Sequence, residues 1–187
     1  IYPSVSGKTI SCNLAGPLLD LNGADNVTID GSLGGTGSSV DLTLENTNTS
    51  STSGTSTLRF RNDATNNTLR YCIVKGASAS SELTSPATYG GTIFFSTTNG
   101  TTGNDANTIQ YNKITNSSGN RAVNTIYSFG SSGSGLENSS NFISNNEIYD
   151  FLNPGEVSNG VYLSSYSKIC TVSNNSFYES SPLFPTK

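Results

Sequence analysis

The chain has 187 residues, of which 33% are hydrophobic and only 12% charged, and its formal net charge is −4. This charge argues against a nucleic-acid-binding protein, which usually presents a basic face. No apolar run is long enough to span a bilayer, so we expect no membrane insertion. Nine tyrosines, eight phenylalanines and many β-branched residues predict strands with polar turns and not a disordered chain.

The N-terminal part predicts one full turn of a repeating β structure. Its three strands are Lys8–Asn13, Pro17–Leu21 and Asn26–Asp30, and Val40–Glu45 opens the next turn. Each is a short apolar segment bounded by Gly, Asn or Asp, which is typical of strands. The glycine-rich segment Gly31–Gly37 lacks the Gly-Lys-Ser/Thr ending of a phosphate loop, so we expect a flexible surface loop there.

From residue 68 onward, an apolar residue is followed three positions later by asparagine and two further on by a second apolar residue. The three columns are Leu69, Ile109, Ile143 and Val172; Cys72, Asn112, Asn146 and Asn175; and Val74, Ile114, Ile148 and Phe177. A weaker column precedes each repeat, with Leu58/Phe60, Ile93/Phe95, Ile126/Phe129 and Val161/Leu163 spaced about 33–35 residues apart. Recurrence at such a period predicts a repeat architecture.

Composition decides which kind of repeat this is. Gly, Asn, Ser and Thr dominate the segments, and no apolar period of 3.6 continues for ten residues, which excludes helical repeats. Short strands that recur once per coil predict an all-β parallel solenoid of roughly four to five coils, with variable loops at the bends. We expect a single β-helix domain over residues 1–187. Because the chain begins at Ile1 without Met or a signal peptide, we expect a fragment of a longer multi-domain protein.

The asparagine column has a predicted structural role. A tight bend often needs left-handed backbone geometry, which Asn tolerates well. Inside the bend, each amide can donate to one neighbour and accept from the next, so Asn112, Asn146 and Asn175 are predicted to form a ladder along the axis. Cys72 cannot supply such a rung, and we expect the ladder to end there. No cysteine spacing matches a zinc site or a disulfide framework, so small buried thiols are expected at all three cysteines.

Three segments carry a resemblance to a known family. They are Asn26–Asn46 (NVTIDGSLGGTGSSVDLTLEN), Asn66–Gly76 (NNTLRYCIVKG) and Val172–Glu179 (VSNNSFYE). The chain resembles the right-handed parallel β-helix domains of the pectate-lyase-like superfamily, in the form carried by large surface proteins that the type IX secretion system exports. The resemblance implies a secreted or bacterial cell-surface location. The C-terminal sorting domain of such proteins is absent from this sequence.

The polysaccharide-degrading members of that superfamily use clustered carboxylates, with Ca²⁺ and a basic residue in the lyases and with a histidine in the hydrolases. This chain has no histidine and no adjacent aspartates. Its best acidic group is Glu147, Asp150 and Glu156, with Glu179 one coil away, and the spacing does not specify a facing pair of carboxylates. We therefore predict no catalytic residue, no metal site and no cofactor. A Ca²⁺ site at these acids is the alternative left open.

Aromatic residues in the C-terminal half suggest where a ligand could bind. Flat rings beside polar groups can stack on sugars, so we name Tyr111, Lys113, Glu147, Tyr149 and Asp150 as candidate glycan contacts. Tyrosines that only close loop packing over the coils are the alternative.

The leading hypothesis is a secreted, structural or adhesive β-helix module that contacts glycans and has no catalytic activity of its own. The expected partners are glycans, other surface proteins, and neighbouring coils or domains of the same protein, and not nucleic acid. A fragment of a polysaccharide lyase or hydrolase is one alternative, and a segment of an extracellular filament is another.

Overall fold

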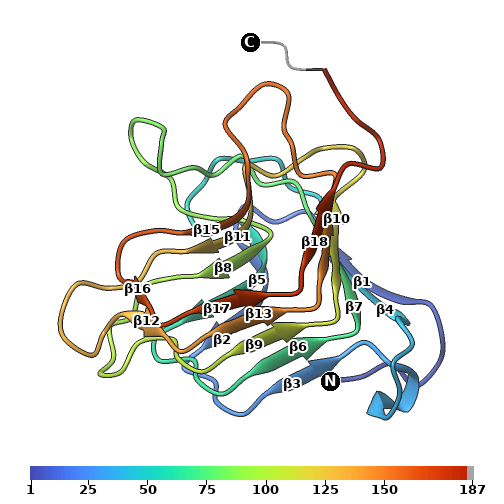
Figure 1. Ribbon diagram of the computed structural model, residues 1–187, viewed down its shortest axis with the longest axis horizontal. Helices are drawn as coiled ribbons and strands as arrows, with labels where there is room; N and C mark the ends of the chain where they lie inside the picture. The colour runs from blue at the N-terminus through green and yellow to red at the C-terminus, as the bar shows by residue number, and fades with distance from the viewer. Residues whose placement is uncertain (185–187) are drawn as a thin grey trace.

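Short parallel strands alternate with polar bends throughout residues 1–184, which are the residues that the computed structural model describes. The strands form three main sheets (Figure 1). Sheet A contains β1 (Lys8–Cys12), β4 (Leu42–Asn46), β7 (Cys72–Gly76), β10 (Lys113–Asn116), β14 (Glu147–Tyr149) and β18 (Ser176–Tyr178). Sheet B contains β2 (Pro17–Asn22), β5 (Ser56–Arg61), β8 (Ile93–Phe95), β11 (Asn124–Ser128) and β15 (Asn159–Leu163). Sheet C contains β3 (Thr28–Asp30), β6 (Thr68–Arg70), β9 (Thr108–Gln110), β13 (Phe142–Ser144) and β17 (Thr171–Ser173).

The chain visits sheets A, B and C in turn, and we call each such passage a coil. Strands of successive coils pair in parallel and in register, as in Ile29 beside Leu69 and Leu69 beside Ile109. A short ribbon of β12 (Asn138–Ser139) and β16 (Ser167–Lys168) follows sheet B in the last two complete coils. The expected all-β architecture with stacked parallel strands is therefore confirmed. The segment Gly31–Gly37, predicted to be a loop, contains the short 3₁₀ turn η1 (Leu33–Gly35).

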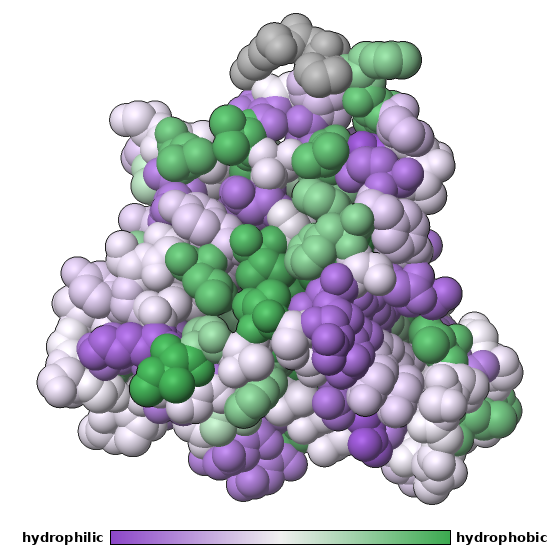
Figure 2. Space-filling view, viewed as in Figure 1, coloured by the Kyte–Doolittle hydropathy of each residue, from purple (hydrophilic) through white to green (hydrophobic). Residues whose placement is uncertain are grey.

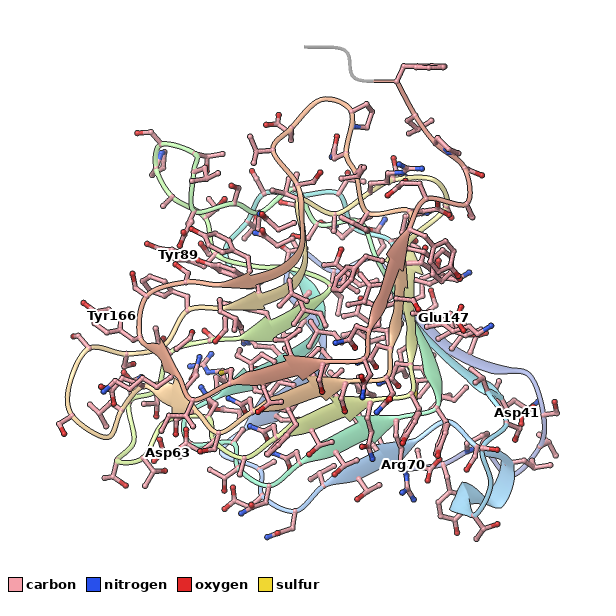
Figure 3. The ribbon with its side chains drawn as sticks, in the orientation of Figure 1. Asp41, Asp63, Arg70, Tyr89, Glu147 and Tyr166 are labelled. Carbon is pink, nitrogen blue, oxygen red and sulfur yellow. The ribbon has the colours of Figure 1, made fainter. Side chains whose placement is uncertain are left out.

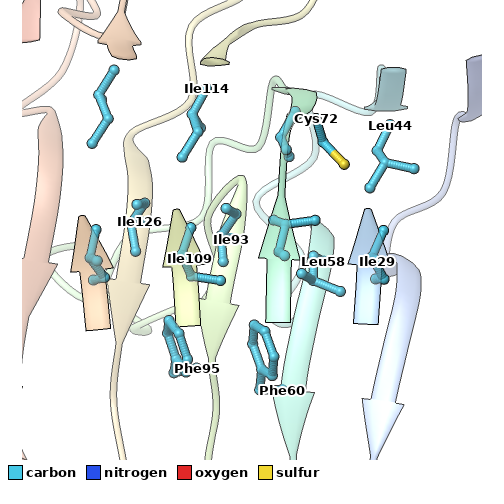
Figure 4. Packing of buried hydrophobic residues seen from close by; sticks show 14 of the residues in the cluster. Ile29, Leu44, Leu58, Phe60, Cys72, Ile93, Phe95, Ile109, Ile114 and Ile126 are labelled. Carbon is cyan, nitrogen blue, oxygen red and sulfur yellow. The ribbon is translucent and has the colours of Figure 1, made fainter. Parts of the chain in front are cut away.

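Apolar residues from all three sheets fill the space between them. Ile109, Ile114, Leu69 and Val74 are fully buried, as the repeat predicts. On sheet B, Phe60 and Phe95 stack with ring centroids 4.6 Å apart, so equivalent side chains of successive coils lie in rows (Figure 4). Because each strand of the three main sheets is only three to six residues long, this shared interior and not any single strand holds the coils together.

The weaker repeat column needs one correction. Phe129 was predicted to follow Phe95 into the interior, but Ser128 pairs with Phe95 and Leu163 and takes that place. The ring of Phe129 stacks instead on Tyr89, a residue of the long segment between β7 and β8. Register is set by backbone pairing over the whole strand, and one bulky residue does not shift it.

The predicted asparagine ladder is present. Asn175 Oδ1 accepts hydrogen bonds from the backbone N–H and the Nδ2 of Asn146, both at 2.9 Å. Asn146 Oδ1 does the same for Asn112, at 3.0 and 3.1 Å. Asn112 Oδ1 then accepts from the backbone N–H of Cys72 at 3.0 Å, where the ladder ends as predicted. Each Nδ2 also donates to a carbonyl of the preceding coil, such as Ile109 for Asn146.

The left-handed residue of this bend is not the ladder asparagine itself. It is the residue immediately before it, with φ near +55° at Tyr71, Tyr111, Asn145 and Asn174. The positive φ turns the chain, and the next residue then points its side chain inward. The prediction that Asn is chosen for left-handed geometry is therefore wrong for the ladder positions, where the amide hydrogen bonds are what the bend requires.

A second ladder was not anticipated from the sequence. Asn67, Asn107 and Asn141 precede the strands of sheet C and repeat the same bonding, again after left-handed residues. In the next coil Cys170 occupies this position, and its thiol donates a hydrogen bond to the carbonyl of Lys168 at 3.4 Å. Cys72 is buried, and burial raises the pKa of its thiol to about 12. Cys12 and Cys170 are only half-buried, so the prediction of buried thiols is right for Cys72 alone.

The last coil leaves its interior residues partly open. Val172 and Phe177 belong to predicted core columns, yet they are 42% and 46% exposed, since no further coil within residues 1–184 covers them. In Figure 2, green hydrophobic surface gathers in the middle of the face that this coil presents. At the other end, the backbone of Ile1 bonds to Thr28 and Asp30 and so covers the edge of β3.

We expect Asn146→Ala to destabilise the fold by about 3 kcal/mol, because it leaves buried backbone groups of Asn112 and Ile109 without partners. Urea unfolding monitored by circular dichroism measures this loss. Gln110→Ala, on the outward side of β9, serves as the control and should cost less than about 0.5 kcal/mol. Equal losses in the two variants would show that the ladder is not a main source of stability.

Candidate functional site

Two tyrosines form a ring stack on the outside of the bend between sheets C and A. Tyr71 and Tyr111 occupy its left-handed position in successive coils, and their rings are parallel with centroids 5.3 Å apart. The guanidinium of Arg70 lies 5.8 Å from the centre of the Tyr71 ring. In the following coil this position is Asn145, so the stack stops at Tyr111, which is 45% exposed. An aromatic face therefore ends beside a small polar side chain.

Charged side chains from sheet A lie next to this stack. Lys113 of β10 and Glu147 of β14 are direct neighbours in register, and Lys113 Nζ lies 3.7 Å from Glu147 Oε1. Glu147 also accepts a hydrogen bond from the hydroxyl of Tyr178 at 2.8 Å, and this bond raises the pKa of Tyr178 to about 12. Tyr149 stacks on Tyr178 with centroids 5.2 Å apart. Four of the five predicted contact residues thus occupy neighbouring outward positions.

A cavity of about 210 Å³ opens between these groups. Its lining includes Tyr71, Tyr111, Asn145, Lys113 and Glu147, with Ser38 and Val40 from the segment before β4. The pairing of Lys113 with Glu147 balances the charge at its edge. Glu147 and Arg70 lie on the same side of the molecule in Figure 3. The cavity combines an aromatic surface with hydrogen-bonding groups of both kinds, which is the usual composition of a small ligand site.

Asp150, the fifth predicted contact, does not reach this surface. It is only 6% exposed, and its carboxylate accepts hydrogen bonds from the backbone N–H groups of Ser180 and Ser181. Arg121, buried at the bend between sheets A and B, lies 3.6 Å from Asp150 and 2.5 Å from Glu179. Burial alone would raise the pKa of Asp150, but these hydrogen bonds and Arg121 hold it below its ordinary value.

The acidic residues considered for catalysis are therefore separated by their partners. Asp150 and Glu179 converge on Arg121, whereas Glu147 is paired with Lys113 and Tyr178. Glu156 lies in a different place, in the wall of a cavity of about 440 Å³ formed by Leu152–Ser158 and Leu183. Within residues 1–184, no three acidic or cysteine side chains are grouped closely enough to hold a metal ion. The same residues include no helix with the length and apolar character needed to cross a bilayer.

The sequence did not predict the roles of two charged residues, the buried Arg121 and the half-buried Glu82. Arg121 donates to the carbonyl oxygens of Leu152 and Ser181 as well as to Glu179, and so ties the C-terminal segment to the coils. Glu82 accepts hydrogen bonds from the hydroxyls of Tyr127, Tyr162 and Ser164. Neither residue belongs to a repeat column, and their partners are 31 to 82 residues away, so no spacing pattern marks them.

Comparison of the chain with protein-family models, with curated proteins and with solved structures found no match. The geometry of the site is thus the basis for any functional assignment.

Arg121→Met should destabilise the protein by about 3–5 kcal/mol, because it leaves the buried carboxylate of Asp150 and the partly buried one of Glu179 without a cation. Lys113→Met is the matched control, since both members of the Lys113–Glu147 pair are 44% exposed and such pairs contribute less than about 1 kcal/mol. Urea denaturation of both variants gives the comparison. A small loss in Arg121→Met would contradict the structural role of this arginine.

Glu82→Gln should lower stability at pH 7 and have little effect at pH 3. Burial would raise the pKa of Glu82, but the bonds from Tyr127, Tyr162 and Ser164 outweigh it and hold the pKa below 4.5. A carboxyl with a depressed pKa stabilises the fold above its unfolded pKa, and this contribution is lost as the pH falls through the folded pKa.

Unfolding free energies at the two pH values test this expectation. Asp105→Asn provides the opposite case, because burial raises the pKa of Asp105 above its ordinary 3.8. Relative to the wild type, Glu82→Gln should become less stable from pH 3 to pH 7, and Asp105→Asn more stable. A Glu82→Gln variant that loses no stability relative to the wild type between pH 3 and pH 7 would refute the assignment for Glu82.

Proposed function

We propose that this chain is a right-handed parallel β-helix module of a secreted or cell-surface protein, with a structural role and a glycan contact at the Tyr111 surface. The observation that carries the proposal is the end of the Tyr71–Tyr111 ring stack beside Asn145, with a cavity of about 210 Å³ at that point. A sugar ring that stacks on Tyr111 continues the column, and Lys113, Glu147 and Asn145 supply hydrogen bonds to its hydroxyls.

The backbone at the stack adds weight to this proposal. Tyr71 and Tyr111 have φ of +54° and +56°, a conformation that costs about 1–3 kcal/mol for such a residue. Asn145 and Asn174 occupy the same position in the next coils, where Asn adopts this φ with less strain. Tyr166, with φ of +60°, shares this strain, so the backbone supports the proposal only together with the exposure of the Tyr111 ring at the end of the stack.

The enzymatic alternative has weaker support. A glycosidase needs two carboxylates that face each other across a substrate. Asp150 and Glu179 are instead held around buried Arg121, and Glu147 is bonded to Lys113 and Tyr178. These carboxylates have structural partners, and none of them faces another across the cavity next to Tyr111.

The filament alternative rests on a different observation, which is the partly exposed interior of the last coil. Head-to-tail stacking of identical chains would place this coil against β1, β2 and β3 of the next molecule. Residue Ile1 already bonds to Thr28 and Asp30 along the edge of β3, so that edge is occupied. The glycan-contacting module therefore remains the function that the site supports best.

Tyr111→Ala should weaken glycan binding about fivefold, since one stacking contact contributes about 1 kcal/mol. A glycan array identifies the ligand, and titration of the best hit with the wild type and the variant gives the ratio. Phe184→Ala is the matched control, because Phe184 is an exposed aromatic residue that does not line this cavity.

Two outcomes would overturn the proposal. Absence of binding across the array, or equal loss in both variants, would remove the glycan contact and leave a structural role alone. Release of new sugar ends from a panel of polysaccharides would contradict a module without catalytic activity.

A further inference from the structure

A second aromatic cavity, of about 300 Å³, lies on the outer side of sheet B. Its lining includes Phe94 and Phe129, together with Tyr89 from the segment between β7 and β8. Arg59 of β5 and residues Ser53 and Gly54 form another part of the wall. Figure 3 places Tyr89 on the side opposite Glu147, so this cavity is separate from the Tyr111 surface. None of the repeat columns predicts it.

The aromatic side of this cavity is held in place by packing. Tyr89 and Phe129 stack with ring centroids 4.3 Å apart and planes within 16° of parallel. Phe94 is 2% exposed and stacks on the buried ring of Tyr127 at 5.5 Å. Tyr127 in turn donates to Glu82 at 2.6 Å, which fixes the segment that carries Tyr89. These rings present an apolar surface that does not need to rearrange before a ligand binds.

The two loops at the rim are bonded to each other. Gly54 N–H donates to the carbonyl of Tyr89 at 2.6 Å, and Tyr89 N–H donates to the hydroxyl of Ser53 at 3.2 Å. Gly54 has φ of +88°, which favours glycine, and a Cβ there would lie 2.5 Å from Arg59 Nη1. The absence of a side chain at this residue thus lets the guanidinium pack against the rim.

The charge of Arg59 is already balanced. Its Nε and Nη2 form a two-point contact with the carboxylate of Asp20, at 2.9 and 2.6 Å. This leaves Nη1 on the side of Gly54 and the cavity, as a donor beside the aromatic wall. An anionic ligand at Nη1 would approach the Asp20 carboxylate as well and be repelled by it. A neutral oxygen acceptor, such as a hydroxyl or ring oxygen, meets no such repulsion.

We propose that this cavity is a second ligand site, which binds one neutral sugar ring. The ring stacks on the Tyr89–Phe129 wall, and Arg59 Nη1 donates a hydrogen bond to one of its oxygens. The hydroxyls of Ser53, Ser96 and Thr97 line the same cavity and suit the remaining hydroxyls of a sugar. The volume is at the lower end of the range for ligand pockets, roughly 300–1,000 Å³, which fits one ring and not an extended chain.

Titration with methyl glycosides of neutral hexoses, followed by NMR of the aromatic side chains, tests the proposal. The expected result is a saturable shift of the Tyr89, Phe94 and Phe129 resonances. Tyr89→Ala should weaken binding about fivefold, as expected for one lost stacking contact. Arg59→Lys should also weaken it, because the lysine keeps a charge for Asp20 but lacks the guanidinium fork.

The control separates this site from the Tyr111 surface. Tyr111→Ala should leave these resonance shifts unchanged, so either site can fail while the other survives. Neutral oligosaccharides in place of methyl glycosides show whether the bound ring is a free sugar or the end of a glycan. Shifts that do not saturate at tens of millimolar, or that persist in both Tyr89→Ala and Arg59→Lys, would overturn the proposal. Tighter binding of methyl glucuronide would overturn its neutral class.

Discussion

A buried backbone that bends sharply needs hydrogen-bond partners inside the molecule, and in this chain asparagine side chains provide them. At the bends that follow β6, β9 and β13, between sheets C and A, the backbone leaves the strand ladder and its N–H group is bonded by the next coil. An asparagine of the next coil accepts that N–H, as Asn146 does for Asn112 and Asn175 for Asn146. Its Nδ2 donates to a carbonyl of the coil before, such as Leu69 for Asn112. Without these amides, each bend would bury unsatisfied polar groups.

Because the ladders provide hydrogen-bond partners for the buried backbone groups at the bends, the side chains that point outward are not needed for this role. The left-handed residue at each of these bends turns its side chain outward, and it is tyrosine in two coils, before Cys72 and before Asn112. On sheet B, the register that places Ser128 inside also places Phe129 outside, against Tyr89. Both aromatic surfaces proposed to contact sugars therefore arise from positions that the interior does not need. A residue with a structural role inside the coil is thus next in sequence to a residue proposed to contact a ligand outside it.

The parts of the structure that recur could be predicted, and the parts that occur once could not. The spacing of Leu69, Cys72 and Val74 returns in later coils, so the inward columns and the end of the first ladder at Cys72 were foreseen. Arg121 and Glu82 have no equivalents in other coils. Only the folded structure brings Glu179 to Arg121 and Tyr162 to Glu82. The prediction that Asp150 contacts a glycan was wrong for the same reason. A residue directly after a strand is expected to be exposed, and the sequence does not show that Arg121 lies beside it. Tyrosine rarely adopts a positive φ, so rules based on residue propensity do not predict a bend at Tyr71 or Tyr111.

The ladders also have a direction. In the bonds between neighbouring rungs, an N–H of one coil donates to an amide oxygen of the coil that follows it in sequence, from Val27 to Asn67, Asn67 to Asn107 and Asn107 to Asn141. A bend is therefore complete only when the next stretch of chain has arrived. Each coil therefore satisfies backbone N–H groups that the coil before it leaves open, and the two ends of a ladder differ in the polar groups they leave unpaired: amide donors at one end and amide acceptors at the other.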